Sequence, residues 1–552
     1  MFHRAIGYVL VCGVLGLMGC AAERPPSAPG DVEQDRTDPN NDVPPNNDGN
    51  NDVNNDGPNN DVNNDQNNEP NNDVNNDGPN NDVNNGFNND VIPTPEGAFI
   101  LQGAVLTPDG VIDPGHVLVV EDTIFCVADD CTQEPEALDA VIIDTRGVIS
   151  PGLIDAHNHL PYNFLPEWIP PRSFTNRYQW ADDPGYEEHI RPFTAHRSSN
   201  SHFCPAARWG ELRSLLHGTT TIMGQSFERT CTSGWVRNAD HNHDLQHDHM
   251  RTTIGSVRDI NDDAAQGYID SFNQPGEPVT RFAVHMAEGI SDNRVDEEFE
   301  SFVGRDPRPN RHAGQSLMVG GTSVLIHSVA VTDDHLLEIA EADAKIVWSP
   351  SSNMVLYGDT ADIGRILELG ITTGLGPDWT VSGEDNMLAE MRFAADYGQQ
   401  MGVDAVDAER LWRMATVDGA DVVGLAGFVG RLEAGQRADI VVFARKNTDP
   451  YESVLQNRAR DVRLVLIDGQ GFYGDEALLA LARHDQCEIY DVCGSSRFIC
   501  VKEPDAVHEW SQEGIGDIRQ QLLDILEGTP DAPDDEQYGR GDELLELVDC
   551  QE

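Results

Sequence analysis

Histidine and acidic side chains follow several apolar, strand-like runs of this 552-residue chain. The first such run ends in DAHNH, residues 155–159. Because strand residues two apart point to the same side, His157 and His159 can reach one metal ion together. A single H-x-H pair arises often by chance, so this pair alone is weak evidence for a metal site.

Three later apolar runs end in side chains of the same kind. His285 ends one run, with Glu288 three residues further on; His327 ends the next, and Asp378 follows the last. A metal ligand beside a carboxylic acid is what proton shuttling requires. Although one strand-end histidine is usually a hydrogen-bonded structural residue, the ordered set indicates a shared site.

These side chains must be positioned by strands that alternate with helices. Polar residues at the carboxyl ends of successive strands are typical of a (β/α)8 barrel, so we expect an α/β fold of this type. After Asp378, Ser382 and Asp385 predict a helix N-cap with its capping-box partner. The helix that follows carries Met387 and Met391 on one stripe.

Motifs along residues 97–475 resemble those of the amidohydrolase superfamily, in its branch of cytosine, guanine and adenosine-type deaminases and triazine chlorohydrolases. The motifs are PGLIDAHNH, LLHGTTTIM, HMAE, WSPSSNMVL, GPDWTVSGEDNMLAEMR, ATVDGADVVGL and GRLEAGQRADIVVF. Two positions depart from the family pattern: Ser349 stands where Cys is usual, and Trp379 replaces a small residue beside Asp378.

The resemblance implies one Zn²⁺ per chain, with Fe²⁺ as the alternative. The implied metal ligands are His157, His159, His285 and Asp378. By the same resemblance, Asp378 takes a proton from the metal-activated water and His327 hydrogen-bonds the developing oxyanion. Glu288 protonates a ring nitrogen and then helps to expel ammonia.

A second metal is disfavoured by the lysine positions. Members of the superfamily with two metals often bridge them through a carboxylated lysine on the fourth strand. Here no lysine precedes Lys345, and Lys345 lies after His327. The lysine bridge is therefore excluded, whereas a glutamate bridge stays open.

The resemblance implies a hydrolase of non-peptide carbon–nitrogen bonds, most directly one that deaminates an amino-substituted N-heterocycle. A cyclic amide or imide hydrolase on the same scaffold is the alternative, and a surface lipoprotein that only binds ligands is the third hypothesis. The expected partner is a small molecule. We expect Tyr162, Trp168, Trp379 and Asn353 to contact it, with the aromatic loop 161–180 serving as a substrate lid or packing on the barrel rim.

The charge of the chain limits its partners. Asp and Glu number 95 and Lys and Arg 36, so the formal net charge is −59. This excess disfavours nucleic acid, whose phosphates are bound by Lys and Arg. It also disfavours an anionic membrane surface, so membrane contact is expected only through a lipid anchor. A homo-oligomer stays open.

Residues 1–20 resemble a bacterial lipoprotein signal, with Cys20 as the lipidated residue; a plain secretory signal is the alternative. The resemblance predicts an exported chain, anchored in the outer membrane. Residues 21–96 repeat Asn, Asp, Pro and Gly and have too few apolar residues to fold, which predicts a disordered tether. Calcium binding by their oxygens is the alternative.

The cysteines after residue 100 are even in number, as expected for disulfides in an exported protein. We expect the pairs Cys126–Cys131 and Cys204–Cys231, and two bridges within 487–550, where zinc binding is the rival interpretation. A histidine cluster at 241–249 is interpreted as a solvated loop, with metal scavenging as the alternative.

The predicted organisation has three folded parts. Residues 97–150 and 428–475 form a composite β-sandwich, residues 151–427 form the barrel, and residues 476–552 form a disulfide-stapled extension. The spacing of apolar residues over 515–525 predicts a helix in that extension.

Overall fold

The computed structural model describes residues 97–194, 200–224, 235–240, 249–253, 257–275, 279–290, 293–309, 311–312, 314–503, 512–527 and 544–550. They belong to one compact unit that spans residues 81–552. The expected signal peptide, the tether and most of the histidine cluster lie outside these ranges. Within them, every helix is too short or too polar to cross a membrane.

Two parallel sheets carry the strands that the sequence analysis assigned to a barrel. One contains β5 (Leu153–Asp155), β6 (Thr219–Ile222) and β7 (Arg237–Asn238); the other contains β8 (His249–Thr253), β9 (Val279–Met286), β10 (Ser323–His327), β11 (Lys345–Trp348) and β12 (Thr373–Leu375). The backbone joins β12 to β5, because Ala156 N–H donates to the Leu375 carbonyl at 3.0 Å. Asp378 N–H likewise donates to the His157 carbonyl at 3.0 Å. The strands thus follow one another in chain order, as an α/β fold with parallel strands requires.

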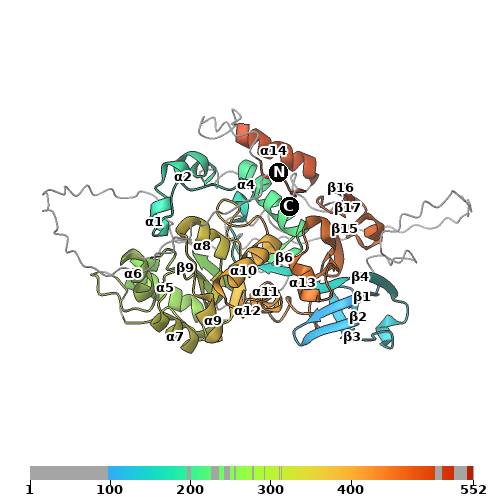
Figure 1. Ribbon diagram of the computed structural model, residues 1–552, viewed down its shortest axis with the longest axis horizontal. Helices are drawn as coiled ribbons and strands as arrows, with labels where there is room; N and C mark the ends of the chain where they lie inside the picture. The colour runs from blue at the N-terminus through green and yellow to red at the C-terminus, as the bar shows by residue number, and fades with distance from the viewer. Residues whose placement is uncertain are drawn as a thin grey trace, which may run out of the picture. The chain divides into compact units, whose positions relative to one another are not determined.

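Helices lie around these strands (Figure 1). They are α4 (Asn200–Leu216), α5 (Asp262–Phe272), α6 (Asn293–Phe302), α7 (Asp333–Glu341), α8 (Pro350–Tyr357), α9 (Ile363–Glu368), α10 (Met387–Met401), α11 (Ala408–Met414) and α12 (Val417–Val422). The segment after β5 adds three short helices, α1 (Arg177–Trp180), α2 (Pro184–His189) and α3 (Arg191–Thr194). Buried apolar residues of strands and helices form one large core.

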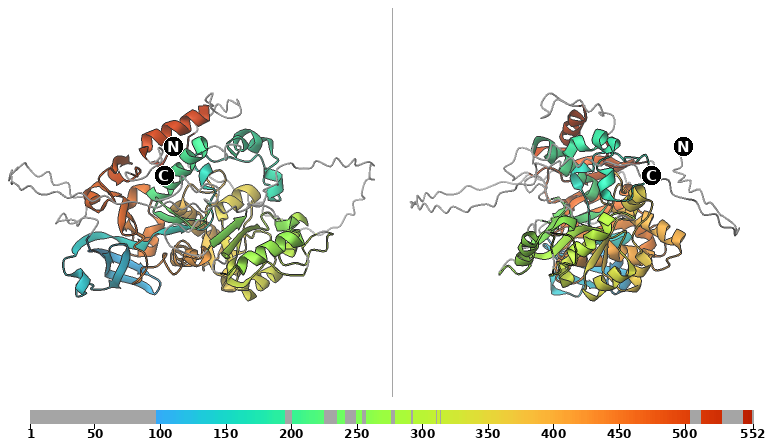
Figure 2. Two further views of the ribbon diagram at one scale, coloured as in Figure 1. Left: turned by 180° about the vertical axis from the view of Figure 1, so that it is seen from behind. Right: turned by 90° about the vertical axis from the view of Figure 1, so that its left-hand side faces the viewer.

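A nine-stranded sheet unites the segments before and after the barrel strands, in the order β16-β17-β15-β14-β13-β4-β1-β2-β3. Its strands are β1 (Phe99–Thr107), β2 (Gly110–Val120), β3 (Thr123–Ala128), β4 (Val141–Pro151), β13 (Ile440–Ala444), β14 (Val462–Ile467), β15 (Gln470–Asp475), β16 (Glu488–Val492) and β17 (Ser495–Ile499). Figure 2 shows the N-terminal strands beside the C-terminal ones, and the register pairs Val441 with Ser150.

All strands of this sheet are hydrogen-bonded in one series, and the segments expected to form a composite β-sandwich both contribute to it. The sheet curls to cover its own apolar face. Ile124 N–H, on the edge strand β3, donates to the Gln436 carbonyl at 2.9 Å, just before β13 begins. Side chains from both ends of the series therefore share one core.

The C-terminal extension contributes to the same sheet, since β17 pairs with β15 through Tyr473 and Ile499. Helix α13 (Pro450–Leu455) contacts both α11 and β13, and the extension adds α14 (Ile515–Glu527). Helix α14 is the one expected over 515–525, and it packs against α4. Arg208 of α4, itself buried, pairs with Glu513 at 2.6 Å.

Three of the expected disulfides are confirmed: Cys126–Cys131, Cys487–Cys500 and Cys493–Cys550. In the described residues, the C-terminal cysteines are thus in disulfides and not in a zinc site. Cys204 is also disulfide-bonded. Its expected partner, Cys231, lies outside the described residues.

Candidate functional site

The ends of β5, β9, β10 and β12 bring the expected metal ligands together. The ring of His157 lies 5.0 Å from that of His159, 4.8 Å from that of His285 and 5.2 Å from that of His327. Oδ1 of Asp378 lies 3.1 Å from His157 Nε2 and 3.2 Å from His159 Nε2. Residues separated by more than 200 positions therefore share one buried cluster, which we call the strand-end cluster.

The backbone at these strand ends turns sharply. His327 has φ of 69° and Asp378 has φ of 74°, in the left-handed region that side chains other than glycine rarely adopt. Ala287, next to Glu288, has φ of 49°. Such strained residues gather at functional sites, where the surrounding structure holds them in place. A Cβ at Gly376 would lie 2.5 Å from the backbone nitrogen of His157, so only glycine lets β12 approach β5 this closely.

The donor atoms of the cluster suit a metal ion. The Nε2 atoms of His157 and His327 are buried and have no hydrogen-bond partner. Burial lowers the pKa of each of these two histidines to about 4, so both rings are neutral and offer a lone pair. Burial also lowers the pKa of His285 well below its usual range. Two overlapping groups of possible metal ligands result: His157–His285–His327 and His157–His159–Asp378. In each group, the ligand atoms of the three side chains lie within 4.8 Å of one another.

Asp378 is held as a carboxylate. Burial alone would raise its pKa, but the neighbouring imidazoles of His157 and His159 outweigh burial and keep the pKa well below its usual range. Its second oxygen, Oδ2, accepts a hydrogen bond of 2.7 Å from the hydroxyl of Ser352. Oδ1 is thus left facing the histidines.

The sequence predicted Ser382 as the N-cap of the following helix, and this prediction is wrong. Asn386 is the N-cap of α10, and its side chain accepts from Ala389 N–H at 3.0 Å. The hydroxyl of Ser382 instead lies 2.9 Å from that of Ser352 and accepts from Trp379 Nε1 at 2.5 Å. The turn after β12 is therefore longer than predicted, and its polar groups serve the strand-end cluster.

Glu288 lies beside the cluster with 3% of its surface exposed. Burial raises its pKa, and the positive charge of Arg177 only partly opposes this effect. Its Oε1 accepts a hydrogen bond of 2.6 Å from Tyr357, and its Oε2 lies 3.7 Å from His327 Nε2. A carboxyl group whose pKa is raised holds its proton more readily than an ordinary glutamate, as a general acid requires.

Asn353, one of the residues expected to bind substrate, is buried and contacts His327. Its Oδ1 lies 3.0 Å from His327 Nδ1, and its amide nitrogen donates to Thr360 at 3.1 Å. Because the amide nitrogen is used as a donor, Oδ1 must accept, and the proton of the neutral His327 ring lies on Nδ1. Nε2 of His327 is therefore an acceptor in the resting site.

The other expected substrate contacts fall into two places. Trp379 lies over the cluster, with its ring 5.5 Å from that of His159 and 5.4 Å from that of Tyr162. Trp180 adds a ring 5.8 Å from Trp379. Trp168 instead stacks on Phe174 at 6.1 Å. The loop after β5 thus includes both side chains beside the cluster and side chains of the packed rim.

Tyr357 and Arg177 reach Glu288 but were not identified as site residues from the sequence. Tyr357 follows Asn353 by four residues in α8, so both occupy one helix face. That spacing could have revealed it. Arg177 is the first residue of the short helix α1, and no sequence pattern places it against Glu288.

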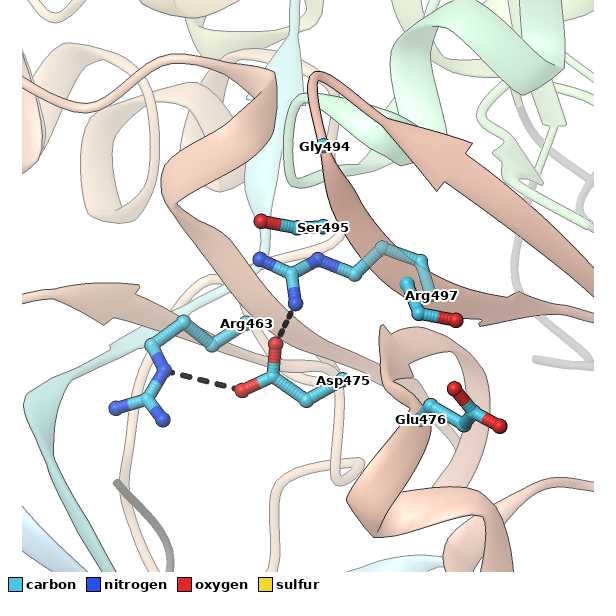
Figure 3. A pocket seen from close by; sticks show the side chains of 7 residues that line it. Arg463, Asp475, Glu476, Gly494, Ser495 and Arg497 are labelled. Carbon is cyan, nitrogen blue, oxygen red and sulfur yellow. Dashed lines mark hydrogen bonds and ion pairs between the residues drawn. The ribbon is translucent and has the colours of Figure 1, made fainter. Parts of the chain in front are cut away.

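A second cavity, of about 500 Å³, lies in the nine-stranded sheet (Figure 3). Asp475 stands between two arginines there, 3.2 Å from Arg463 Nε and in contact with Arg497. The carboxylate of Asp475 is thus shared by the two arginines. This arrangement stabilises the sheet.

Comparison with known proteins identifies a matching protein family and similar enzymes. Residues 280–471 match the model of the amidohydrolase family. Over these residues the chain is similar to that family. Its relatives include 5-methylthioadenosine/S-adenosylhomocysteine deaminases. That of Halobacterium salinarum is 28% identical, over 69% of this chain and 93% of that enzyme. That of Thermoanaerobacter pseudethanolicus is 25% identical, over 60% of this chain and 83% of that enzyme.

Solved structures of low identity share the amidohydrolase fold. An adenosine deaminase from Xanthomonas campestris with bound zinc has a TM-score of 0.50 at 18% identity, covering 69% of this chain and 94% of that one. Guanine deaminase of E. coli has a TM-score of 0.51 at 16% identity, covering 68% and 99%. The matches confirm the predicted family, its deaminase branch, and an enzyme that hydrolyses carbon–nitrogen bonds.

Proposed function

We propose that this amidohydrolase removes ammonia from an amino-substituted N-heterocycle, and that its substrates belong to the adenosine-type class of its relatives. The observation that carries the proposal is the position of Glu288, a buried acid whose Oε2 lies 3.7 Å from His327 Nε2 at the edge of the strand-end cluster. The relatives named as deaminases act on 5-methylthioadenosine and S-adenosylhomocysteine, which makes these two compounds the first to test.

The residues present fit a resident metal ion, and we propose a single Zn²⁺. His157, His159, His285 and Asp378 would hold it, since their donor atoms converge and His157 Nε2 has no other partner. When bound, the metal supplies Lewis acidity, which lowers the pKa of water toward neutrality. The zinc reported for the structural neighbour supports this choice over iron.

The chain's own groups then move the protons. Asp378, a carboxylate in the resting site, accepts a proton from the attacking water at Oδ1. His327 accepts a hydrogen bond from that water at Nε2, and it can donate to the developing oxyanion only after taking up a proton there. Glu288 donates its proton to the ring nitrogen of the substrate, because an amidine carbon is a poor electrophile until that nitrogen is protonated. Asp378 then gives the proton that it took from the water to the amino group, which departs as ammonia, and Glu288 takes back a proton from the newly formed hydroxyl group.

The burial of Glu288 favours deamination over cyclic amide hydrolysis. A metal-polarised carbonyl needs no acid opposite the attacking water, whereas an N-heterocycle does. Trp379 lies beside His159, and Tyr162 and Trp180 pack against Trp379, so aromatic rings gather next to the cluster, which suits a planar substrate.

The proposal also covers the barrel architecture and the cellular location of the enzyme. A closed (β/α)8 barrel is the architecture implied by the order of the parallel strands and by the solved neighbours. Lipid anchoring through Cys20, outside the described residues, remains our proposal for location. The confirmed disulfides support an oxidising compartment.

The test is ammonia release by the purified, zinc-loaded chain from a panel of adenosine-type nucleosides, other amino-heterocycles and cyclic imides. The proposal expects turnover of at least one aminopurine compound and loss of that turnover in Glu288→Gln. Turnover of cyclic imides alone, with Glu288→Gln as active as the unaltered chain, would contradict it.

A further inference from the structure

We propose that Tyr357 is a positioning residue that selects which oxygen of Glu288 carries the transferred proton. The inference rests on the proposed function, because it concerns the proton that Glu288 gives to the substrate. It adds to that function a residue that neither the motifs nor the comparisons assign to the site.

The hydroxyl of Tyr357 has two partners, and their chemistry fixes its direction. Trp180 Nε1 lies 2.9 Å from it, and Glu288 Oε1 lies 2.6 Å from it. An indole nitrogen can only donate, so the tyrosine oxygen accepts from Trp180. The single proton of the hydroxyl is then directed to Glu288. Since Tyr357 is 2% exposed, water does not compete for either contact.

The two oxygens of Glu288 are therefore unequal. Oε1 accepts from Tyr357, whereas Oε2 faces His327 Nε2 at 3.7 Å and Arg177 Nη1 at 3.9 Å. A carboxyl group that accepts a hydrogen bond at Oε1 carries its own proton best at Oε2. Tyr357 thus keeps the transferable proton on the oxygen that points to the strand-end cluster.

The short helix α1 holds the other side of this arrangement. Arg177 N–H donates to the Glu288 carbonyl at 3.1 Å, and Ile290 N–H donates to the Thr175 carbonyl at 2.9 Å, which joins α1 to the loop of Glu288. Trp180, at the end of α1, lies 5.8 Å from Trp379. Tyr357 therefore connects α8, α1 and the proton-carrying loop at one atom.

The first test is kinetic and uses Tyr357→Phe, which removes one oxygen and keeps the ring. A displaced acid group lowers the rate of the chemical step more than it weakens substrate binding. We therefore expect kcat to fall about ten- to hundredfold while KM changes little. Zinc content should stay the same. Trp180→Phe removes the hydrogen bond from Trp180 to the Tyr357 hydroxyl but leaves the contact between Tyr357 and Glu288. The hydroxyl can then rotate, so kcat should fall by a smaller factor.

Tyr451→Phe is the matched control. The Tyr451 hydroxyl is also buried but has no hydrogen-bond partner, and its ring packs on Trp412 at 5.3 Å in a different part of the chain. This variant should keep the kcat of the unaltered chain. A loss in Tyr451→Phe equal to that in Tyr357→Phe would mean a general packing effect and would overturn the inference.

The second test needs no turnover. The infrared difference between the unaltered chain and Glu288→Gln isolates the carboxyl band of Glu288, and Tyr357→Phe should shift that band. If the unaltered chain deaminates nothing, the proposed function fails, while the band still reports the contact. If deamination is seen but Tyr357→Phe keeps full kcat, or if the band does not move, the inference is wrong and the proposed function stands.

Discussion

Two groups of metal-type side chains lie within the described residues, and only one is built as a site. The strand-end cluster combines histidines with Asp378, and the C-terminal extension brings together His484, Cys487 and Cys500. In the second group the sulfurs are joined in a disulfide, so neither is a thiolate able to bind a metal. In the first, His157 Nε2 is buried in a neutral ring, makes no hydrogen bond and lies 3.1 Å from the Asp378 carboxylate. Proximity of ligand types is thus insufficient, and unengaged lone pairs mark the functional cluster.

The largest expected effect comes from removing a ligand of the strand-end cluster. His157→Ala or Asp378→Asn should abolish bound zinc and lower kcat/KM by about 10⁴-fold or more, because both water activation and its proton acceptor are lost. Elemental analysis and ammonia release measure the two effects. Wild-type activity in either variant would show that the cluster is not the active site.

Glu288→Gln separates proton transfer from metal binding within the same cluster. The amide keeps the size of the side chain but cannot give up a proton, so we expect kcat to fall about 10³-fold with zinc retained. Steady-state kinetics on the best purine substrate checks this. A parallel loss of zinc would mean that Glu288 supports the metal and not the proton transfer.

Asn353→Ala tests whether the ring of His327 must be fixed. Without the Oδ1 acceptor 3.0 Å from Nδ1, the ring can change tautomer and rotate, so kcat should fall about 10- to 100-fold. KM should change less, because Asn353 is fully buried and contacts the histidine. An increase in KM alone would restore the original expectation that Asn353 binds substrate.

The double variant Cys487→Ser/Cys500→Ser tests the second group of metal-type side chains, in the C-terminal extension. We expect unchanged zinc content and kcat, since this group lies in the extension. The free energy of unfolding should fall by about 3 kcal/mol, the typical contribution of a disulfide closing a loop of this size. Chemical denaturation with paired activity assays measures both, and loss of zinc in the double variant would reverse the assignment of the two groups.

Glu390→Gln should give the smallest effect. It tests how a buried carboxyl group makes the free energy of unfolding depend on pH. Burial raises the pKa of Glu390 well above its usual range, and hydrogen bonds from Ser351 only partly oppose this. Above the ordinary Glu pKa, the folded chain keeps a proton that the unfolded chain has released. The free energy of unfolding therefore falls as pH rises toward the folded-state pKa. Glu390→Gln should flatten that fall in denaturation series at several pH values, and an unchanged slope would contradict it.

The sequence predicted which side chains gather in the strand-end cluster better than it predicted their surroundings. His157, His285, His327 and Asp378 were found because each follows an apolar strand, a local pattern that parallel strands convert into proximity. The motifs then supplied the roles. The helix start at Asn386 was missed, because the turn after β12 uses Ser382 for a tertiary hydrogen bond, which no local pattern encodes.

The contacts that shape the acid were also beyond local pattern. Tyr357 and Arg177 meet Glu288 only because α8 and α1 pack on the loop after β9, from distant parts of the chain. The curled nine-stranded sheet was likewise expected only as a combination of flanking segments. Its register depends on long-range pairing, such as that of β17 with β15, which the residues of either strand do not specify alone.

The most direct test of the central claim is the zinc content of the full chain after extensive dialysis, measured beside His157→Ala and the Cys487→Ser/Cys500→Ser pair. The account predicts one zinc per chain in the unaltered protein and in the cysteine variant, and none in His157→Ala. Zinc retained by His157→Ala, or lost with the cysteines, would contradict the claim that the strand-end cluster is the metal site of this amidohydrolase.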